Sequence, residues 1–267
     1  MSNNDVKYRN AGRWNKVAAV TLSFWVLKIL ATTLGETSGD LLAITLNLGY
    51  VAGLAITMVF LIAVLCAQLS ASRFHAFLFW AAIVGTTTVG TEISDLMDRT
   101  LHLGYTGGSA LLISGLLATL ALWRWHQGRI RIHPITGRGE ELFYWTAILF
   151  SNSLGTAFGD FLSDSAGLGY VTGALVTAGV IALVLLLHYA TRLNHVLLFW
   201  VAFVFTRPFG ATFGDFLTKP LAKGGLNFGT GQASAVTLAL LVIVVGTTLW
   251  YGRRTAATPI SNTGNAP

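Results

Sequence analysis

Residues 145–160 of this 267-residue chain read WTAILFSNSLGTAFGD, and the same spacing of landmark residues occurs four times in the sequence. In each copy a tryptophan is followed ten residues later by a glycine and five residues after that by an aspartate. The tryptophans are Trp25, Trp80, Trp145 and Trp200, the glycines are Gly35, Gly90, Gly155 and Gly210, and the aspartates are Asp40, Asp95, Asp160 and Asp215. A fixed spacing repeated along the chain predicts a tandem array of one structural unit.

Each copy continues into a second apolar stretch that begins shortly after the aspartate. The second stretches begin with Leu48-Gly49-Tyr50, Leu103-Gly104-Tyr105, Leu168-Gly169-Tyr170 and, after a short insertion, Leu226-Asn227-Phe228. A membrane-spanning helix needs about 20 mostly apolar residues. Eight stretches of that length are present, at 15–36, 48–68, 75–97, 103–123, 141–163, 168–189, 194–217 and 226–250. The sequence therefore predicts eight spans, two in each unit.

The overall composition agrees with a membrane protein. Hydrophobic residues make up 54% of the chain and charged residues 10%, whereas soluble domains carry about 25% charged residues. The net charge of +6 comes from basic residues in short loops, where they orient a membrane protein, so nucleic acid is not an expected partner. The single cysteine, Cys66, has no partner for a disulfide within the chain.

The distribution of basic residues predicts the orientation in the membrane. Most of the lysines and arginines fall on one side of the eight-span arrangement, which the positive-inside rule assigns to the cytoplasm. Both termini are then cytoplasmic, as short tails at 1–13 and 252–267. The longest loop, 124–140, is also cytoplasmic and separates a first half, 14–123, from a second half, 141–251.

Because each unit crosses the membrane twice, all four units are expected to have the same orientation. Repeats of this kind are related by an axis along the membrane normal. The expected fold is an all-α membrane protein whose eight transmembrane helices form four parallel two-helix repeats. The first helix of each unit carries the acids and pairs of small residues that begin with the repeated glycine, which favour close helix packing. It is therefore expected to line the centre, with the second helix outside it. The four aspartates would then lie at one depth, either as one ring or as two pairs.

The arrangement of four tandem repeats, each with two transmembrane segments and a tryptophan, resembles a family of bacterial membrane proteins classed as repeats of unknown function. The resemblance covers the chain from about Phe24 to Trp250. It implies a location in the bacterial inner membrane, and it implies no activity. Any functional hypothesis therefore has to come from individual residues.

Acidic residues inside a span are costly and usually face a bundle interior or a water-filled pathway. Four aspartates at one depth therefore favour a shared cation site over four separate helix caps. Glu36 and Glu92 add negative charge in the first half only, and Asp98 lies on the outer side of Asp95. The predicted cation ligands are Asp40, Asp95, Asp160, Asp215, Glu36, Glu92 and Asp98.

Two basic residues, Lys28 and Arg207, lie within predicted spans and deeper than the acids. Buried charges generally need partners, so these side chains are expected to be counter-ions of the acids, with a purely structural salt bridge as the alternative. The route inward is expected to be lined by Thr33, Thr88, Asn152 and Ser153. Threonine and serine in membrane helices often bond to their own backbone instead.

The leading functional hypothesis is membrane transport of a cation. A donor set made only of oxygen atoms favours a hard divalent ion, Mn²⁺, Mg²⁺ or Ca²⁺, and clustered carboxylates let protons compete with the ion. Proton-coupled export is a specific form of this hypothesis, and both channel and transporter are compatible with the sequence. The expected partners are the lipid bilayer, the cation and protons. No cofactor is expected apart from the transported ion, and the sequence carries no signal for an oligomeric state.

Two alternatives come from other classes of protein. The Gly-Asp pairs at 159–160 and 214–215 are similar to segments of intramembrane aspartyl proteases, which use two specialised aspartates. A non-transporting scaffold would instead shield the acids with cations of the same chain. Because the same segment is repeated four times and no other catalytic motif is present, the chain is not expected to be an enzyme.

Overall fold

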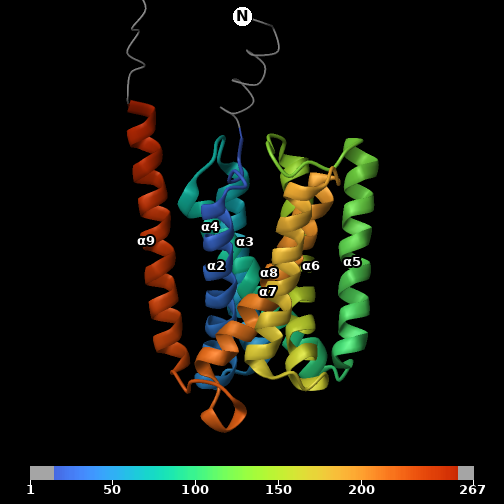
Figure 1. The fold of residues 1–267 in the computed structure, drawn as a ribbon, viewed down its shortest axis with the longest axis vertical. Coiled ribbons are helices and arrows are strands. Elements are labelled where there is room, and N and C mark those ends of the chain that lie inside the picture. The colour runs from blue at the N-terminus through green and yellow to red at the C-terminus, as the bar shows by residue number, and fades with distance from the viewer. Residues whose placement is uncertain (1–14, 258–267) are drawn as a thin grey trace, which may run out of the picture.

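In the computed structural model, which describes residues 15–257, eight long helices run side by side (Figure 1). They are α2 (Leu22–Asp40), α3 (Gly49–Ser70), α4 (Ala76–Asp95), α5 (Gly104–Gln127), α6 (Arg138–Asp160), α7 (Gly169–Ala190), α8 (His195–Thr218) and α9 (Thr230–Ala257). The described range contains no β-strand. The all-helical expectation is thus confirmed, with one long helix for each predicted stretch.

The helix ends differ from the sequence-based boundaries by a few residues. The first predicted stretch, 15–36, is represented by α2, which begins later and continues to the aspartate. The predicted loop 124–140 is shorter, because α5 extends to Gln127 and α6 begins at Arg138. The predicted tail 1–13 lies outside the described residues. In the predicted tail 252–267, the part up to residue 257 continues α9 and the remainder is outside the described range.

The helices form an inner ring and an outer layer. Four helices, α2, α4, α6 and α8, contact one another in that order, and α8 closes the ring on α2. Outside it, α3 packs on α4, α5 on α6 and α7 on α8, while α9 packs on α2. The second helix of each unit therefore packs on the first helix of the next unit, and the last unit contacts the first. The expectation that the first helices line the centre is met.

Connections at the two ends of the bundle show that the inner helices run in the same direction. Figure 1 places the connections α3–α4, α5–α6 and α7–α8 at one end, here called the upper end. The turns after α2, α4 and α6 lie at the opposite, lower end. The start of α2 and the end of α9 are both at the upper end. Each inner helix accordingly begins at the upper end and carries its aspartate at the lower end.

The turns at the lower end explain the recurring Leu-Gly-Tyr motif. After α2, α4 and α6 the chain forms short π-helical turns, η1 (Leu41–Thr45), η2 (Leu96–Thr100) and η3 (Phe161–Ser165). The next long helix then begins at a glycine with φ of 75° at Gly49, 67° at Gly104 and 68° at Gly169. These are left-handed conformations that glycine adopts readily. In the fourth unit the insertion forms the 3₁₀ turn η4 (Leu221–Lys223), and Asn227, with φ of 54°, takes the place of the glycine.

Glycines allow the inner helices to approach closely, in a contact that recurs around the ring. A Cβ atom built on Gly35 would lie 2.3 Å from Thr87 Oγ1, and one on Gly155 would lie 2.5 Å from Arg207 Cβ. The same contact relates Gly90 to Asn152 and Gly210 to Thr32. Each glycine thus contacts the residue that lies three positions before the corresponding glycine of the next unit. Contacts of this kind are typical of small residues between membrane helices. The predicted packing role of these glycines is confirmed.

Aromatic side chains fill the upper half of the ring. In each unit the residue before the repeated tryptophan is also aromatic and contacts the tryptophan of the next unit. The ring centroids are 5.6 Å apart for Phe24 and Trp80, 5.5 Å for Phe79 and Trp145, 6.5 Å for Tyr144 and Trp200, and 5.8 Å for Phe199 and Trp25. We call these eight side chains the aromatic layer. It packs the centre of the bundle above the acidic residues.

Six helices are long and apolar enough to cross a membrane by length and composition. They are Gly49–Ser70, Ala76–Thr100, Gly104–Gln127, Gly169–Ala190, His195–Thr218 and Thr230–Gly252. The two long helices that do not reach this level of hydropathy, α2 and α6, are inner helices whose polar side chains face the other inner helices. The helices as well as the composition therefore indicate a multi-pass membrane protein.

Candidate cation site

The four repeated aspartates lie at the lower ends of the inner helices and are all buried. Asp40, Asp95 and Asp160 are the last residues of α2, α4 and α6, and Asp215 lies one turn before the end of α8. Their exposed fractions are only 4–6%. None of the first three caps the π-helical turn that follows with its side chain. The alternative of separate helix caps is thus not what the structure shows.

Three carboxylates from three inner helices come together in a group that we call the carboxylate triad. Glu36 of α2, Asp160 of α6 and Asp215 of α8 each offer an oxygen, and these oxygens all lie within 4.8 Å of one another. All three residues are buried. Glu36 lies one helical turn above the level of the aspartates. The triad has the donor type and the spacing needed to hold a hard cation.

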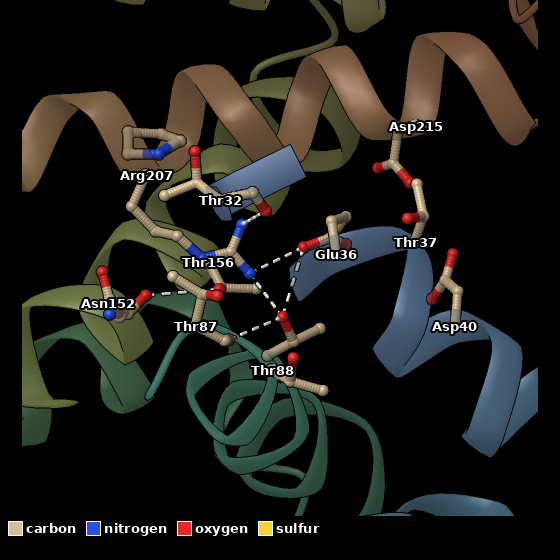
Figure 2. A network of polar contacts seen from close by, with 12 residues as sticks. Thr32, Glu36, Thr37, Asp40, Thr87, Thr88, Asn152, Thr156, Arg207 and Asp215 are labelled. Atoms are coloured by element: carbon tan, nitrogen blue, oxygen red, sulfur yellow. Dashed lines mark hydrogen bonds and ion pairs between the residues drawn. The ribbon is translucent and has the colours of Figure 1, made fainter. Parts of the chain in front are cut away.

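Arg207 of α8 enters this region from the upper side and is fully buried. Its Nη2 donates a hydrogen bond to Glu36 Oε2 at 2.8 Å and another to the hydroxyl of Thr91, and its Nη1 donates to the carbonyl oxygen of Thr32 at 3.4 Å. Figure 2 shows the guanidinium group between Thr32 and Glu36. Asp215 and Asp40 lie beyond Glu36, on the side away from Arg207. The predicted pairing of Arg207 with an acid is confirmed, with Glu36 as the partner. The pair is common to the counter-ion hypothesis and to its alternative, a purely structural salt bridge.

Two basic residues approach the aspartates from the lower side. Lys219 Nζ lies 2.6 Å from Asp40 Oδ2 and 3.1 Å from Asp215 Oδ1, so it bridges α2 and α8. Arg99 Nε lies 3.0 Å from Asp95 Oδ1. Burial alone would lower the pKa of Lys219. The charges of Asp215 and Asp40 raise it by a larger amount, so its pKa lies above the ordinary value. Lys219 therefore keeps its charge at neutral pH.

Asp160 differs from the other three aspartates in its surroundings. Across residues 15–257, no lysine or arginine lies within ion-pair distance of its carboxylate. Its neighbours in the carboxylate triad are both acids. The triad thus contains one carboxylate without an ion pair to a described basic residue, and Arg99, whose charge acts on it, is paired with Asp95.

Two predicted ligands, Glu92 and Asp98, lie elsewhere. Glu92 is 1% exposed, and its carboxylate packs against Gly53 of α3. Asp98 belongs to η2, and its Oδ1 packs against Gly108 of α5. Although Asp98 lies on the outer side of Asp95, both of its carboxylate oxygens are buried. Neither side chain belongs to the carboxylate triad.

Lys28 is fully buried but is not brought to an acid. Its ammonium group donates a hydrogen bond to Asn152 Oδ1 at 2.8 Å and lies 4.0 Å from the centroid of the Phe203 ring. Within the described part of the chain it forms no ion pair. Asn152 in turn donates to Thr86 Oγ1 at 3.1 Å. The predicted pairing of Lys28 with the acids is therefore wrong, and an amide and an aromatic ring take the place of the carboxylate.

The other residues predicted to line a pathway are buried between helices. Thr88 and Ser153 donate to carbonyl oxygens of their own helices, Val84 at 3.0 Å and Leu149 at 3.1 Å. Thr33 is 2% exposed. The backbone-bonding alternative holds for Thr88 and Ser153, and of the four residues only Asn152 joins helices through its side chain.

Sequence reasoning missed several polar partners. Arg99 and Lys219 lie four residues after Asp95 and Asp215, which is the spacing of a helical ion pair and could have identified them. A second buried polar group lies at the upper end, where Glu141 accepts from Lys16 and, at 3.0 Å, from Gln68. These three residues are far apart in the sequence, so no local signal marks them.

Comparison with known proteins identifies the repeats. One family, described as Repeat of Unknown Function (DUF347), matches the chain four times, at residues 23–74, 78–129, 143–194 and 198–254. Each match covers one inner helix and the outer helix that follows it. No curated protein and no solved structure matches the chain. With four matches that together cover most of its length, the chain belongs to the DUF347 repeat family.

Proposed function

We propose that this protein is a transporter of a hard divalent cation in the bacterial inner membrane, with the carboxylate triad as its binding site. The observation that carries the proposal is the approach of Glu36, Asp160 and Asp215 to within 4.8 Å from three separate inner helices. Sites built only from oxygen donors suit Mn²⁺, Mg²⁺ or Ca²⁺. The cation is the transported substrate, and neither a resident cofactor nor an enzymatic activity is part of the proposal.

The proposal includes eight membrane-spanning helices, arranged as four parallel two-helix repeats about an axis along the membrane normal. Support comes from the closed inner ring and from the recurring glycine contacts around it. At 1.5 Å per residue, helices as long as α2 and α6 reach about as far as their neighbours in the ring. Their polar residues face the interior, so they need not be apolar all round. The upper end, which carries most of the basic loop residues, then faces the cytoplasm.

The balance of charge around the triad supports a cation as ligand. Besides the half-buried Asp98, six buried acidic residues lie at the level of the aspartates or within one turn of it, and three basic side chains pair with them. The carboxylates are Glu36, Asp40, Glu92, Asp95, Asp160 and Asp215, and the basic partners are Arg99, Arg207 and Lys219. Because uncompensated buried charge is costly, the surplus negative charge has to be met by cations or protons. The need for this compensation favours transport of the cation in exchange for protons over transport of the cation alone.

Calorimetry on purified protein tests the binding site. We expect heat of binding from at least one of Mn²⁺, Mg²⁺ and Ca²⁺, and at least a tenfold loss of affinity in Asp160→Asn. The matched control is Asp98→Asn, which removes the same charge outside the triad and should retain the affinity of the parent protein. Absence of binding by the parent, or equal losses in both variants, would count against the triad.

Flux measurements in proteoliposomes test transport itself. The expected result is movement of the bound ion across the membrane by the parent protein and loss of that movement in Asp160→Asn. A non-transporting scaffold is the second candidate, because Glu36, Asp40, Asp95 and Asp215 are already paired with basic residues of the same chain. Ion binding without flux would favour the scaffold.

The hydrolase alternative rests on the nearness of Asp160 and Asp215 alone. An aspartyl hydrolase would lose all turnover when either residue is changed to asparagine and would tolerate the same change at Asp40 and Asp95. Cleavage of a peptide substrate with that pattern would replace the transport proposal.

A further inference from the structure

The carboxyl group of Glu92 lies in a cradle formed by two glycines of neighbouring helices. A Cβ atom built on Gly53 of α3 would be 2.7 Å from Glu92 Oε1, and one built on Gly39 of α2 would be 3.7 Å from the same oxygen. Any larger residue at Gly53 would meet the carboxyl group. The side chain is therefore enclosed where α2, α3 and α4 meet, and it is 1% exposed.

Neither oxygen of this carboxyl group has a hydrogen-bond partner among the described residues. The charges that act on it are Asp95 on its own helix and Asp40 and Glu36 on α2, which are all acids and each pair with a basic residue. At this lower end of the bundle, the titratable groups on the other elements packed around α4 are Tyr50 of α3, Asp98 and Arg99 of η2 and Asp160 of α6. Arg99 is already paired with Asp95. An ionised carboxylate with acidic neighbours and no partner is costly to bury, so these surroundings favour a neutral, protonated group.

The equivalent positions of the other units contain no titratable side chain. They are Thr37, Ala157 and Thr212. Thr212 packs its methyl group on Gly173 of α7, as Glu92 packs on Gly53, and its hydroxyl donates to the carbonyl oxygen of Pro208 at 2.8 Å. Packing at this position therefore requires only a small side chain, and in one unit the chain contains a glutamate instead.

We propose that Glu92 is a proton-binding site, which holds a proton at neutral pH and releases it when a cation occupies the carboxylate triad. The proposal rests on the proposed function and removes Glu92 from the cation ligands. The step is a simple exchange, in which the carboxyl group loses a proton to water and becomes a carboxylate while the triad gains the cation. A cation held by the triad, which includes Glu36, adds positive charge to this region and favours the ionised form of Glu92, whereas the buried carboxyl group without a partner otherwise retains its proton. Glu92 would thus couple proton release to cation binding.

The variant Glu92→Gln tests the coupling, because glutamine has the shape of the protonated glutamic acid and cannot release a proton. Titration of the cation in two buffers with different ionisation heats gives the number of protons released for each ion bound. We expect about one proton fewer in Glu92→Gln than in the parent, together with a shallower dependence of cation affinity on pH. Equal proton release by the two proteins would overturn the proposal.

Infrared spectroscopy tests whether Glu92 holds a proton without any cation. Protein labelled with ¹³C in its glutamate carboxyl groups should show an isotope-shifted carbonyl band of a protonated acid at neutral pH. The band should be absent in Glu92→Gln and present in the control Glu36→Gln, because Glu36 has an ion-pair partner in Arg207 and Glu92 has none. A parent protein without the shifted band would overturn the proposal. Failure of the parent to bind any cation would instead remove the proposed function, and the infrared band would still decide whether Glu92 holds a proton.

Discussion

Arg207 is the residue on which the polar centre of the bundle most depends. It is 0% exposed, and its guanidinium group contacts α2 through Glu36 and Thr32 and α4 through Thr91. In the other units the equivalent positions, Thr32, Thr87 and Asn152, are neutral. The ring therefore has one long basic side chain, Arg207, at a position that is neutral in the other three units. Glu36 on the neighbouring helix forms an ion pair with it.

Removing Arg207 should destabilise the protein because Glu36 would remain as an uncompensated buried charge. Breaking one side of a buried ion pair costs about 3–5 kcal/mol, so Arg207→Ala should show a markedly lower unfolding temperature in detergent. Adding Glu36→Gln to a chain with Arg207→Met should recover most of that loss, since both charges are then absent. A double variant as unstable as Arg207→Ala would mean that packing, and not charge, dominates at this position.

A glycine of the inner ring provides a second test at the scale of single residues. In Gly210→Ala the new Cβ would lie 2.2 Å from Thr32 Oγ1 and 3.0 Å from the Thr32 backbone carbon, so α8 and α2 would have to separate. Overpacking of this kind costs about 1–3 kcal/mol. The control is Gly179→Ala in α7, where nothing lies within 4 Å of the new Cβ. Thermal unfolding should be lowered only in Gly210→Ala, and an equal response of the two variants would contradict close contact in the ring.

At the scale of helices, the sequence predicted the number of elements and their inner or outer position, because both follow from local hydrophobicity and from the repeated spacing. It did not predict the aromatic layer or the bridge that Lys219 makes between α2 and α8, because these join residues of different units. The π-helical turns were also missed, since Leu-Gly-Tyr marks only the start of the next helix. The carboxylate triad was predicted in part. The repeated spacing predicted that the four aspartates lie at one depth. It could not predict which carboxylates come close together, because that depends on how the inner helices pack around the ring.

The packing of the last helix, α9, against the first unit can be tested by cross-linking. Thr45 Oγ1 of η1 lies 2.8 Å from Thr230 Oγ1 at the start of α9, so cysteines at both positions should form a disulfide. The experiment uses Cys66→Ala as background and a protease site inserted in the loop 128–137. After cleavage at this site, a disulfide between the two positions keeps the two fragments together on a non-reducing gel. The matched control pairs Thr230→Cys with Thr100→Cys, the equivalent threonine of η2. Joined fragments in the control, or separate fragments in the test protein, would contradict packing of α9 against the first unit.

For the molecule as a whole, the acidic region lies between two closures of different kinds. Above it are Lys28 and the aromatic layer, and below it are the ion pairs of Lys219 and Arg99. Two surface hollows on the described part of the protein are lined mainly by apolar residues, and neither includes a carboxylate. A transported cation would therefore require one closure to open at a time. Separation of Lys219 from Asp40 and Asp215 involves only side chains, whereas opening the aromatic layer requires the inner helices to move.

The last prediction concerns the crossing of the membrane by α2 and α6, the two long helices that are too polar to be recognised by hydropathy. Exposed positions flank each of them, with Val20 and Leu46 around α2 and Thr136 and Ala166 around α6. Single cysteines at these positions, in Cys66→Ala, are treated in intact cells with a maleimide that cannot cross the inner membrane but reaches its outer face. We expect Leu46→Cys and Ala166→Cys to react at once, and Val20→Cys and Thr136→Cys to react only after the inner membrane is permeabilised. If the two positions around either helix react from the same side, that helix does not cross, and the four units cannot all have the same orientation.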